Sequence, residues 1–386
     1  MRFKVAKRDI EAALQVVDSS IVSSGSDMSA HYTFRRTGPD GDGKYGVEVL
    51  SYGGRIFSSC PLIVVVEDAG KKGALTIEGW RLKQWLQNIG DDTAPDFTLD
   101  EGEVIARVPR GKQTFQSLDP SSFPYWDKTL KDAKVTARIP ANRLAAALAY
   151  SRLFASDKDK ETKAPQLCVC EIQNGILYST DKKAATLIKV EGMDASGLRV
   201  HVKDVGGFLT FLGTVGDGDV EVLEHERMAL VRRCLDGAVF GEARFHFAYP
   251  PQKAGINDTD QWCWDIPKAE FQQAIGFLRS GAAKEDNRLN IAPGENAGEI
   301  ILSMQSATGK PTNLTLAGIG MTSAANAPPI PDEGFVVDHI ILAKAMAPWK
   351  ETTVRFGLST KGDRGLLRLV HEQFESKFLT VLPWMR

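Results

Sequence analysis

Apolar residues recur along the chain in a pattern that is repeated three times. Residues 139–144 (Ile-Pro-Ala-Asn-Arg-Leu) and 266–271 (Ile-Pro-Lys-Ala-Glu-Phe) both read as a short apolar strand that runs through proline into a helix, and residues 5–10 are a weaker third copy. Proline is common in the first helical turn, where an N–H would have no partner. Apolar residues follow at helical spacing, which predicts an amphipathic helix after each opening.

Each repeat is predicted to hold a second helix and then three strands. The second helices are expected over residues 80–89, 202–212 and 336–347. The middle one contains Gly206 and Gly207, which are costly inside a helix. A block of three strands follows each second helix and ends on an apolar element with proline, at Pro124, Pro250 and Pro383.

The repeat predicts an α+β protein of three tandem domains, each with two helices on strand-rich sheets. The domains are expected over residues 1–132, 133–257 and 258–386. Polar residues 131–134 and 252–261 are the predicted linkers between them. A chain of 386 residues is longer than one core usually serves, which agrees with more than one domain.

Composition limits the classes of function. The formal net charge is −2, so any contact with nucleic acid must use basic residues that are segregated on one surface. The chain has neither a signal-peptide core nor an apolar run long enough to span a membrane, so we expect a cytoplasmic protein without membrane contact. The 5 cysteines are scattered and odd in number, which is typical of reduced thiols, and no zinc-ligand spacing accompanies them. We therefore expect no metal and no cofactor.

Four segments carry a resemblance to a known family. Residues 111–124 look like the end of its first domain, and residues 178–181 (Tyr-Ser-Thr-Asp) are similar to an Ala-Thr-Asp motif of its second. Residues 335–356 look like the last helix and strand of its third domain, and residues 380–386 (Thr-Val-Leu-Pro-Trp-Met-Arg) look like its Val-Met-Pro-Met-Arg tail. Over its full length the chain thus resembles the beta subunit of bacterial DNA polymerase III, the three-domain sliding clamp.

The resemblance implies a closed ring and a set of partners. Two copies would join head to tail as a homodimer, so that six domains close a ring with sheets outside and twelve helices around the hole. Such a ring encircles double-stranded DNA without sequence preference. It tethers DNA polymerase and other proteins through short peptide motifs, depends on a clamp loader, and has no catalytic activity of its own. A phage-encoded clamp in an infected bacterial host would fit a sequence this divergent.

The DNA-facing residues are predicted from helix phase together with the resemblance. On the exposed sides of the predicted helices bases outnumber acids, whereas most acidic residues lie in strands and loops. This division fits a basic hole and an acidic rim. Tyr150 is also expected to point outward. The predicted set is Arg8, Arg81, Lys83, Arg143, Arg152, Lys158, Lys160, Lys163, Lys203, Lys268, Arg279 and Lys344.

Two loops differ in what they add to this set. Residues 156–163 correspond to a family loop that touches DNA, and they are rich in lysine. Residues 18–30 correspond to a loop that the family usually makes basic, but here they contain neither lysine nor arginine. The contact of that second loop with DNA is therefore not expected.

The resemblance also implies a peptide pocket between the second and third domains, an apolar cleft with a polar rim. His339 stands where the family has a tyrosine, and residues 182–185 (Lys-Lys-Ala-Ala) stand where it has Gly-His-Arg-Leu, which predicts a peptide preference of this chain's own. The alternative is that residues 381–384 are only the last core strand. The predicted pocket consists of Thr180, Lys182, Lys183, Ala185, Pro250, His339, Val381, Leu382, Pro383, Trp384, Met385 and Arg386.

The dimer interface is expected where a helix of the third domain meets the end of the first domain of the other copy. The resemblance assigns Phe277 and Leu278 to that helix and Phe115 to the opposing strand. Phe115 is equally well interpreted as an ordinary core residue.

Two other classes of function stay open. An enzyme is one, although the chain has no H-E-x-x-H, P-loop or G-x-S-x-G motif, and residues 216–219 (Gly-Asp-Gly-Asp) are typical of a β-turn. A strand-rich adaptor or virion protein is the other, and it would keep the repeat without needing basic residues on matching helix faces. Turnover would identify an enzyme, and stimulation of polymerase processivity would identify a clamp. A ring-shaped dimer in micrographs would separate a clamp from an adaptor.

Overall fold

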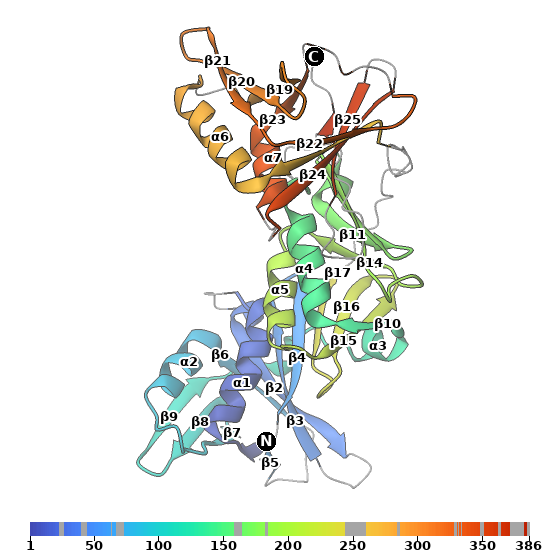
Figure 1. The fold of residues 1–386 in the computed structure, drawn as a ribbon. Helices are drawn as coiled ribbons and strands as arrows, with labels where there is room; N and C mark the ends of the chain where they lie inside the picture. Colours follow the sequence, from blue (N-terminus) through green and yellow to red (C-terminus); the bar gives the residue numbers. More distant parts are fainter. Residues whose placement is uncertain are drawn as a thin grey trace. The chain divides into compact units, whose positions relative to one another are not determined.

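The structure is a computed structural model, and Figure 1 shows its helices and strands in sequence colours. Its backbone contacts group into two compact units. The first unit consists of Met1–Leu148, Ile172–Asn174 and Glu191–His246, and the second of Ala149–Glu171, Gly175–Val190 and Phe247–Arg386. The division into three domains at residues 132 and 257 stays a prediction. The structure describes residues 1–22, 27–39, 45–62, 64–66, 73–157, 164–181, 184–243, 260–283, 286–327, 330, 332, 334–347, 351–361, 364–370 and 382–383.

The helices follow the predicted order closely. The α-helices are α1 (Lys7–Val17), α2 (Gly79–Gln87), α3 (Asp127–Asp132), α4 (Ala141–Arg152), α5 (Val205–Gly213), α6 (Lys268–Gly281) and α7 (His339–Met346). The 3-10 turns are η1 (Asp18–Ser20), η2 (Met28–Ala30), η3 (Pro120–Ser122) and η4 (Pro165–Cys168). In the described part of the chain, no helix is long and apolar enough to cross a membrane.

The first unit contains two antiparallel sheets. The five-stranded sheet has the order β5 (Val65–Val66), β1 (Arg2–Lys4), β7 (Asp96–Asp100), β8 (Glu103–Val108) and β9 (Gly111–Gln116). The eight-stranded sheet has the order β10 (Lys134–Pro140), β15 (Asp219–His225), β16 (Met228–Arg233), β17 (Val239–Ala243), β4 (Ile56–Leu62), β3 (Tyr45–Tyr52), β2 (His31–Pro39) and β6 (Ala74–Glu78).

The second unit contains a five-stranded and a four-stranded sheet. Its five-stranded sheet has the order β22 (Gly320–Ser323), β18 (Trp262–Pro267), β24 (Thr353–Lys361), β25 (Arg364–Val370) and β26 (Leu382–Pro383). Its four-stranded sheet has the order β21 (Pro311–Leu316), β20 (Ile300–Gln305), β19 (Arg288–Pro293) and β23 (Phe335–Asp338). In the same unit β12 (Ile176–Thr180) pairs with β13 (Ala185–Lys189). The remaining strands of the described chain are β11 (Val169–Gln173) and β14 (Leu198–His201).

The eight-stranded sheet is continuous because β17 pairs with β4, which joins the predicted first and second domains. Glu242 lies opposite Ile56 in this antiparallel pair, and Gly241 lies opposite Phe57. A Cβ atom at Gly241 would lie 2.5 Å from the Phe57 ring and 2.5 Å from Leu230 Cδ2. Real Cβ atoms do not approach neighbours this closely, so glycine is required where the two strands meet.

The first predicted linker is not a free polar segment. Residues 127–132 form α3, and Lys134 begins β10. Trp126, just before α3, stacks on Phe57 with ring centroids 4.0 Å apart, and Leu130 packs against the same buried cluster. The segment therefore covers the sheet beside the β4–β17 pair and buries apolar surface there. The second predicted linker lies outside the described residues apart from positions 260 and 261.

The helix predictions differ from the structure in three places. The helix predicted from residue 202 forms as α5 but begins only at Val205. Its Gly207 permits close packing, since a Cβ there would lie 2.7 Å from Phe240 Cζ. The helix predicted from residue 336 begins only at His339, because residues 335–338 are strand β23 and the Asp338 carboxylate accepts the Ile340 N–H at 2.9 Å. Tyr150 was expected to point outward, but this prediction was wrong, since its side chain is buried.

Candidate DNA-facing helices and peptide-binding site

The predicted bases on α1 and α2 lie on the exposed sides of their helices. The apolar stripes that define the opposite sides are buried, as Ile10 and Leu14 illustrate in α1 and Leu82 in α2. Arg8 is highly exposed, with Nε 3.5 Å from Asp9 Oδ1. Arg81 is also exposed.

Several of these bases are paired with carboxylates. Arg81 Nε lies 2.8 Å from Glu78 Oε2, and Lys83 forms an ion pair with Asp18. In α4, Arg143 Nη1 donates to Glu191 Oε2 at 2.6 Å. Helix phase does not reveal these partners, because the acids lie outside the helix or at its edge. The exposed helix faces are therefore less positive than the predicted residue set alone indicates.

The other predicted bases lie at the surface of their own unit where they are described. Arg152 ends α4, Lys203 precedes α5, Arg279 lies on α6 and Lys344 on α7, and all four are exposed. Lys268, at the start of α6, is half-buried. The predicted loop residues Lys158, Lys160 and Lys163 lie outside the described residues.

Thr180 is the last residue of β12, and β13 begins at Ala185. Its Oγ1 donates to the Ala184 carbonyl at 2.7 Å, and the Asp181 carboxylate accepts the Ala184 N–H at 2.9 Å. Ser179 Oγ donates to the Ser151 carbonyl at 2.6 Å, which ties β12 to α4. Thr180 is therefore buried in a fixed backbone, while Ala185 at the start of β13 is half-buried.

His339 is the first residue of α7 and is buried. Its backbone N–H donates to the Asn287 carbonyl at 3.0 Å. Burial lowers the pKa of the His339 imidazole, and Arg279 lowers this pKa further against the opposing effect of Asp338. His339 is thus buried at the start of α7, and its assignment to the peptide pocket stays a prediction.

The chain terminus contributes a short strand. Leu382 lies opposite Leu367 and Pro383 opposite Leu366, so β26 forms the edge of the five-stranded sheet. This agrees with the last-strand alternative for these two positions and leaves the pocket assignment a prediction. The other predicted pocket residues, Lys182, Lys183, Pro250, Val381, Trp384, Met385 and Arg386, lie outside the described residues.

The three predicted interface residues differ in exposure. Phe115 is buried, and its ring makes a T-shaped contact with Trp85 at 5.9 Å between centroids, so it is a core residue of its own unit. Leu278 is buried on the inner side of α6. Phe277 is 58% exposed, so it is the residue of the three that offers its side chain to another molecule.

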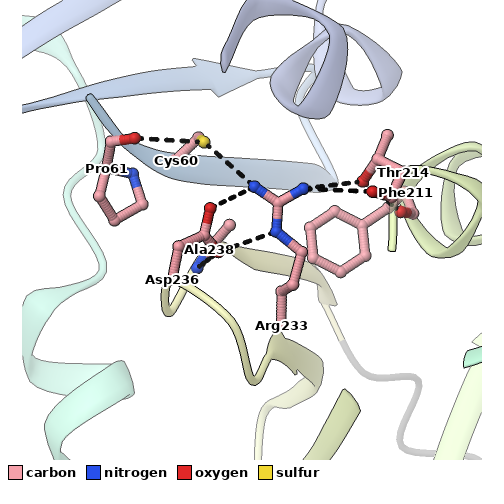
Figure 2. A network of polar contacts seen from close by, with 7 residues as sticks. All are labelled: Cys60, Pro61, Phe211, Thr214, Arg233, Asp236 and Ala238. Carbon is pink, nitrogen blue, oxygen red and sulfur yellow. Dashed lines mark hydrogen bonds and ion pairs between the residues drawn. The ribbon is translucent and has the colours of Figure 1, made fainter. Parts of the chain in front are cut away.

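Two partly buried polar clusters beside the β4–β17 pair were not predicted from the sequence. In the first, Arg233 of β16 donates through Nε to Asp236 Oδ1 at 2.8 Å and through Nη1 to Thr214 Oγ1 at 3.3 Å, and its Nη2 lies 3.8 Å from Cys60 Sγ (Figure 2). Burial raises the pKa of the Cys60 thiol to about 11. Cys60 is therefore a protonated thiol at neutral pH, which is unsuited to nucleophilic chemistry.

In the second cluster, two carboxylates share one guanidinium. Arg55 Nη2 lies 2.8 Å from Glu242 Oε1 and 2.7 Å from Asp204 Oδ2. The Glu242 side chain is fully buried and also accepts the His201 N–H at 3.1 Å. Burial raises the pKa of Glu242 well above its ordinary value, and Asp204 raises it further. No short motif marks this cluster, because its members come from distant segments that only the sheet pairing brings together.

Within the described residues there is no group of three or more His, Cys, Asp or Glu that could hold a metal ion. The cysteines are free thiols, and Cys60, Cys168 and Cys170 are buried.

This architecture is similar to that of several solved structures. The DNA polymerase III subunit beta from Pseudomonas aeruginosa matches with a TM-score of 0.80 at 13% identity, over 100% of both chains. The beta subunit from DNA polymerase of Streptococcus pyogenes matches with a TM-score of 0.78 at 14% identity, again over 100% of both chains. The chain has the sliding-clamp fold. A DnaN sliding clamp from Bartonella birtlesii bound to griselimycin matches over 100% of both chains, with a TM-score of 0.77 at 17% identity.

Sequence comparison finds no matching family model and no matching curated protein. The likeness to sliding clamps therefore lies in the fold, and it confirms the predicted α+β fold class and the resemblance that the sequence carries. The assignment of individual residues to DNA, to a peptide or to a partner copy stays a prediction.

Proposed function

We propose that this chain is a DNA polymerase processivity factor, a sliding clamp that encircles duplex DNA and tethers DNA polymerase and other partners through short peptide motifs. It acts in the cytoplasm of a bacterium or of an infected bacterial host, after a clamp loader has placed it, and has no catalytic activity of its own. The observation that supports this most is the match over 100% of the chain to the polymerase III beta subunit of P. aeruginosa, at a TM-score of 0.80.

Ring closure needs a second copy, and the chain contains a template for how the copies would join. Within the first unit, β17 pairs with β4. By position in the repeat, β9 corresponds to β17 and β21 corresponds to β4. Both β9 and β21 are outer strands of their sheets. The β21 strand of one copy can therefore extend β9 of another, in the same way that β4 extends β17. The two joined surfaces differ, so the contact is head to tail, and in the proposed ring a second identical contact closes the pair of copies.

One helix position supports the same arrangement. Counted from the opening of each repeat, Val16, Tyr150 and Phe277 are equivalent. Val16 is buried in α1, which contacts α5, and Tyr150 is buried with its hydroxyl donating to the Ala345 carbonyl of α7 at 2.9 Å. In both cases the first helix of one repeat meets the second helix of the next. Phe277 has no following repeat within the chain, and it is the exposed member of the three.

The partner of Phe277 follows from the same correspondence. Ala345, which Tyr150 contacts, is the seventh residue of α7, and Trp85 is the seventh residue of α2. Trp85 is half-buried, with its indole in T-shaped contact with the rings of Phe97 and Phe115. In the proposed ring, Phe277 of one copy packs against Trp85 of the other. Phe115 then supports the interface from beneath, and does not itself touch the partner copy.

Primer extension tests the proposed function directly. The polymerase and clamp loader from the same genome would copy a primed circular template in the presence of excess competitor DNA. A clamp lengthens the products made in one binding event, and this gain is lost on a linear template because the ring slides off the end. Product lengths that do not respond to the protein, or respond equally on linear DNA, would contradict the proposal.

A further inference from the structure

Trp80 is an exposed aromatic side chain that the ring contacts leave without a role. It is the second residue of α2 and is 47% exposed. Its equivalent in the third repeat is Ile340 of α7, which remains 36% exposed although α7 is already in contact with Tyr150 of α4. The contact of a second helix with the first helix of the preceding repeat therefore leaves the second residue of that helix exposed. Trp80 lies on the side of α2 that faces neither the sheet nor the adjoining repeat.

The indole of Trp80 is held in place by a neighbouring carboxylate. Its Nε1–H donates to Glu78 Oε1 at 2.5 Å, while Arg81 Nε donates to Glu78 Oε2 at 2.8 Å. The Arg81 guanidinium lies 5.3 Å from the centroid of the indole ring. The start of α2 is closely packed, because a Cβ at Gly79 would lie 2.6 Å from Ile21 Cδ1. The ring and the cation are thus presented together on a firmly seated helix end.

The surrounding surface has the chemistry of a single-strand binding site. Gln84 and Gln87 follow Trp80 on the exposed side of α2, and the helix itself contains no acidic residue. Arginine and amide groups contact phosphates without sequence preference. Aromatic rings stack on nucleobases, and any base can supply the opposing face. Bases inside a duplex are stacked on their neighbours and have no free face, so an aromatic ring of this kind selects an unpaired base.

We propose that Trp80 and Arg81 form a stacking site for an unpaired base of single-stranded DNA, such as the template strand beside a primer end. This inference rests on the proposed function, which turns the exposed side of α2 toward the hole of the ring. Single-stranded DNA is then a second ligand of the protein besides the duplex, and it is bound by stacking as well as by charge.

Binding of labelled oligo(dT) and of a duplex of equal length, measured by fluorescence anisotropy at low salt, tests the site in the full-length protein. Trp80→Ala is expected to weaken oligo(dT) binding by about fivefold or more, the usual loss for one base–aromatic stack. Trp80→Phe keeps a ring and is expected to stay within about twofold of wild type. Leu235→Ala, which removes an apolar side chain that is 89% exposed elsewhere in the same unit, is the matched control and should leave binding unchanged.

The duplex separates stacking from general affinity. Trp80→Ala should leave duplex binding unchanged, and Glu78→Gln should tighten oligo(dT) binding because it removes a negative charge while keeping an acceptor for the indole. Equal oligo(dT) affinity of Trp80→Ala and wild type would overturn the site, and so would an equal loss on both DNAs. If the residue instead docks a protein, Trp80→Ala would leave oligo(dT) binding intact and lower polymerase binding. Failure of wild type in the primer-extension test would reject the clamp itself, independently of Trp80.

Discussion

Replacing Glu242 by glutamine tests the buried cluster beside the β4–β17 pair. The amide keeps the shape of the side chain and an oxygen for the His201 N–H, which now meets a carboxylate oxygen at 3.1 Å, but it removes the charge. Burial and the nearby Asp204 raise the pKa of Glu242, so the folded protein binds this proton more tightly than the unfolded chain does. The corresponding stability is complete below the unfolded pKa and is lost as the pH rises through the folded pKa.

The magnitude follows from linkage. Between the two pKa values, one proton gives a slope of about −1.4 kcal/mol of unfolding free energy per pH unit. Glu242→Gln should remove this contribution and be at least as stable as wild type at about pH 8. Arg55→Ala is the contrasting variant, because it leaves two carboxylates without their shared cation. It should cost about 2–3 kcal/mol, below the full value for a broken buried pair, since the Arg55 side chain is 40% exposed.

Urea unfolding between about pH 5.5 and 8.5, followed by tryptophan fluorescence, measures both effects. The difference between Glu242→Gln and wild type should grow in favour of the variant as the pH rises, because all other titrating groups are shared. An unchanged pH slope would refute the reasoning, and so would a destabilisation by glutamine that is constant across the range.

Three further predictions concern other residues. Phe277→Ala should shift the purified protein from dimer toward a folded monomer in sedimentation velocity, whereas an unchanged dimer would reject the interface assignment. Gly241→Ala should lower the unfolding free energy by about 1–3 kcal/mol, because a methyl group must displace Phe57 across the strand pair, and a neutral result in thermal unfolding would contradict that packing. Cys60, whose pKa burial raises to about 11, should resist alkylation at pH 8 until the protein is unfolded, as mass spectrometry can measure, and rapid labelling would show that the buried thiol is accessible.

The periodic apolar residues predicted the helices well, because burial against one sheet imposes a helical repeat on the sequence. Ile10 and Phe271 show this directly, since each begins a stripe that is buried as expected. The glycines of α5 lower its intrinsic helix propensity, yet the helix forms, because Gly207 allows close packing of α5 on Phe240. Where local propensity left a helix ambiguous, tertiary packing determined whether it forms.

The site could be predicted only in part, because the missing information lies between repeats. Tyr150 appears polar and outward by helix phase, yet it is buried by α7, a helix almost 200 residues later in the chain. The pairing of Arg81 with Glu78 and of Lys83 with Asp18 also depends on where neighbouring segments fold. Trp80 offered a visible signal, an aromatic residue beside arginine on the polar side of a helix. That signal becomes informative only when its equivalent Ile340 is seen to stay exposed.

Direct imaging of the purified protein by electron microscopy, together with its mass in solution, tests the central claim without needing a loader or a polymerase. The account predicts a dimer whose class averages are closed rings with a central hole wide enough for a DNA duplex. Compact particles without a hole, or a monomer at concentrations at which sliding clamps are assembled, would contradict it.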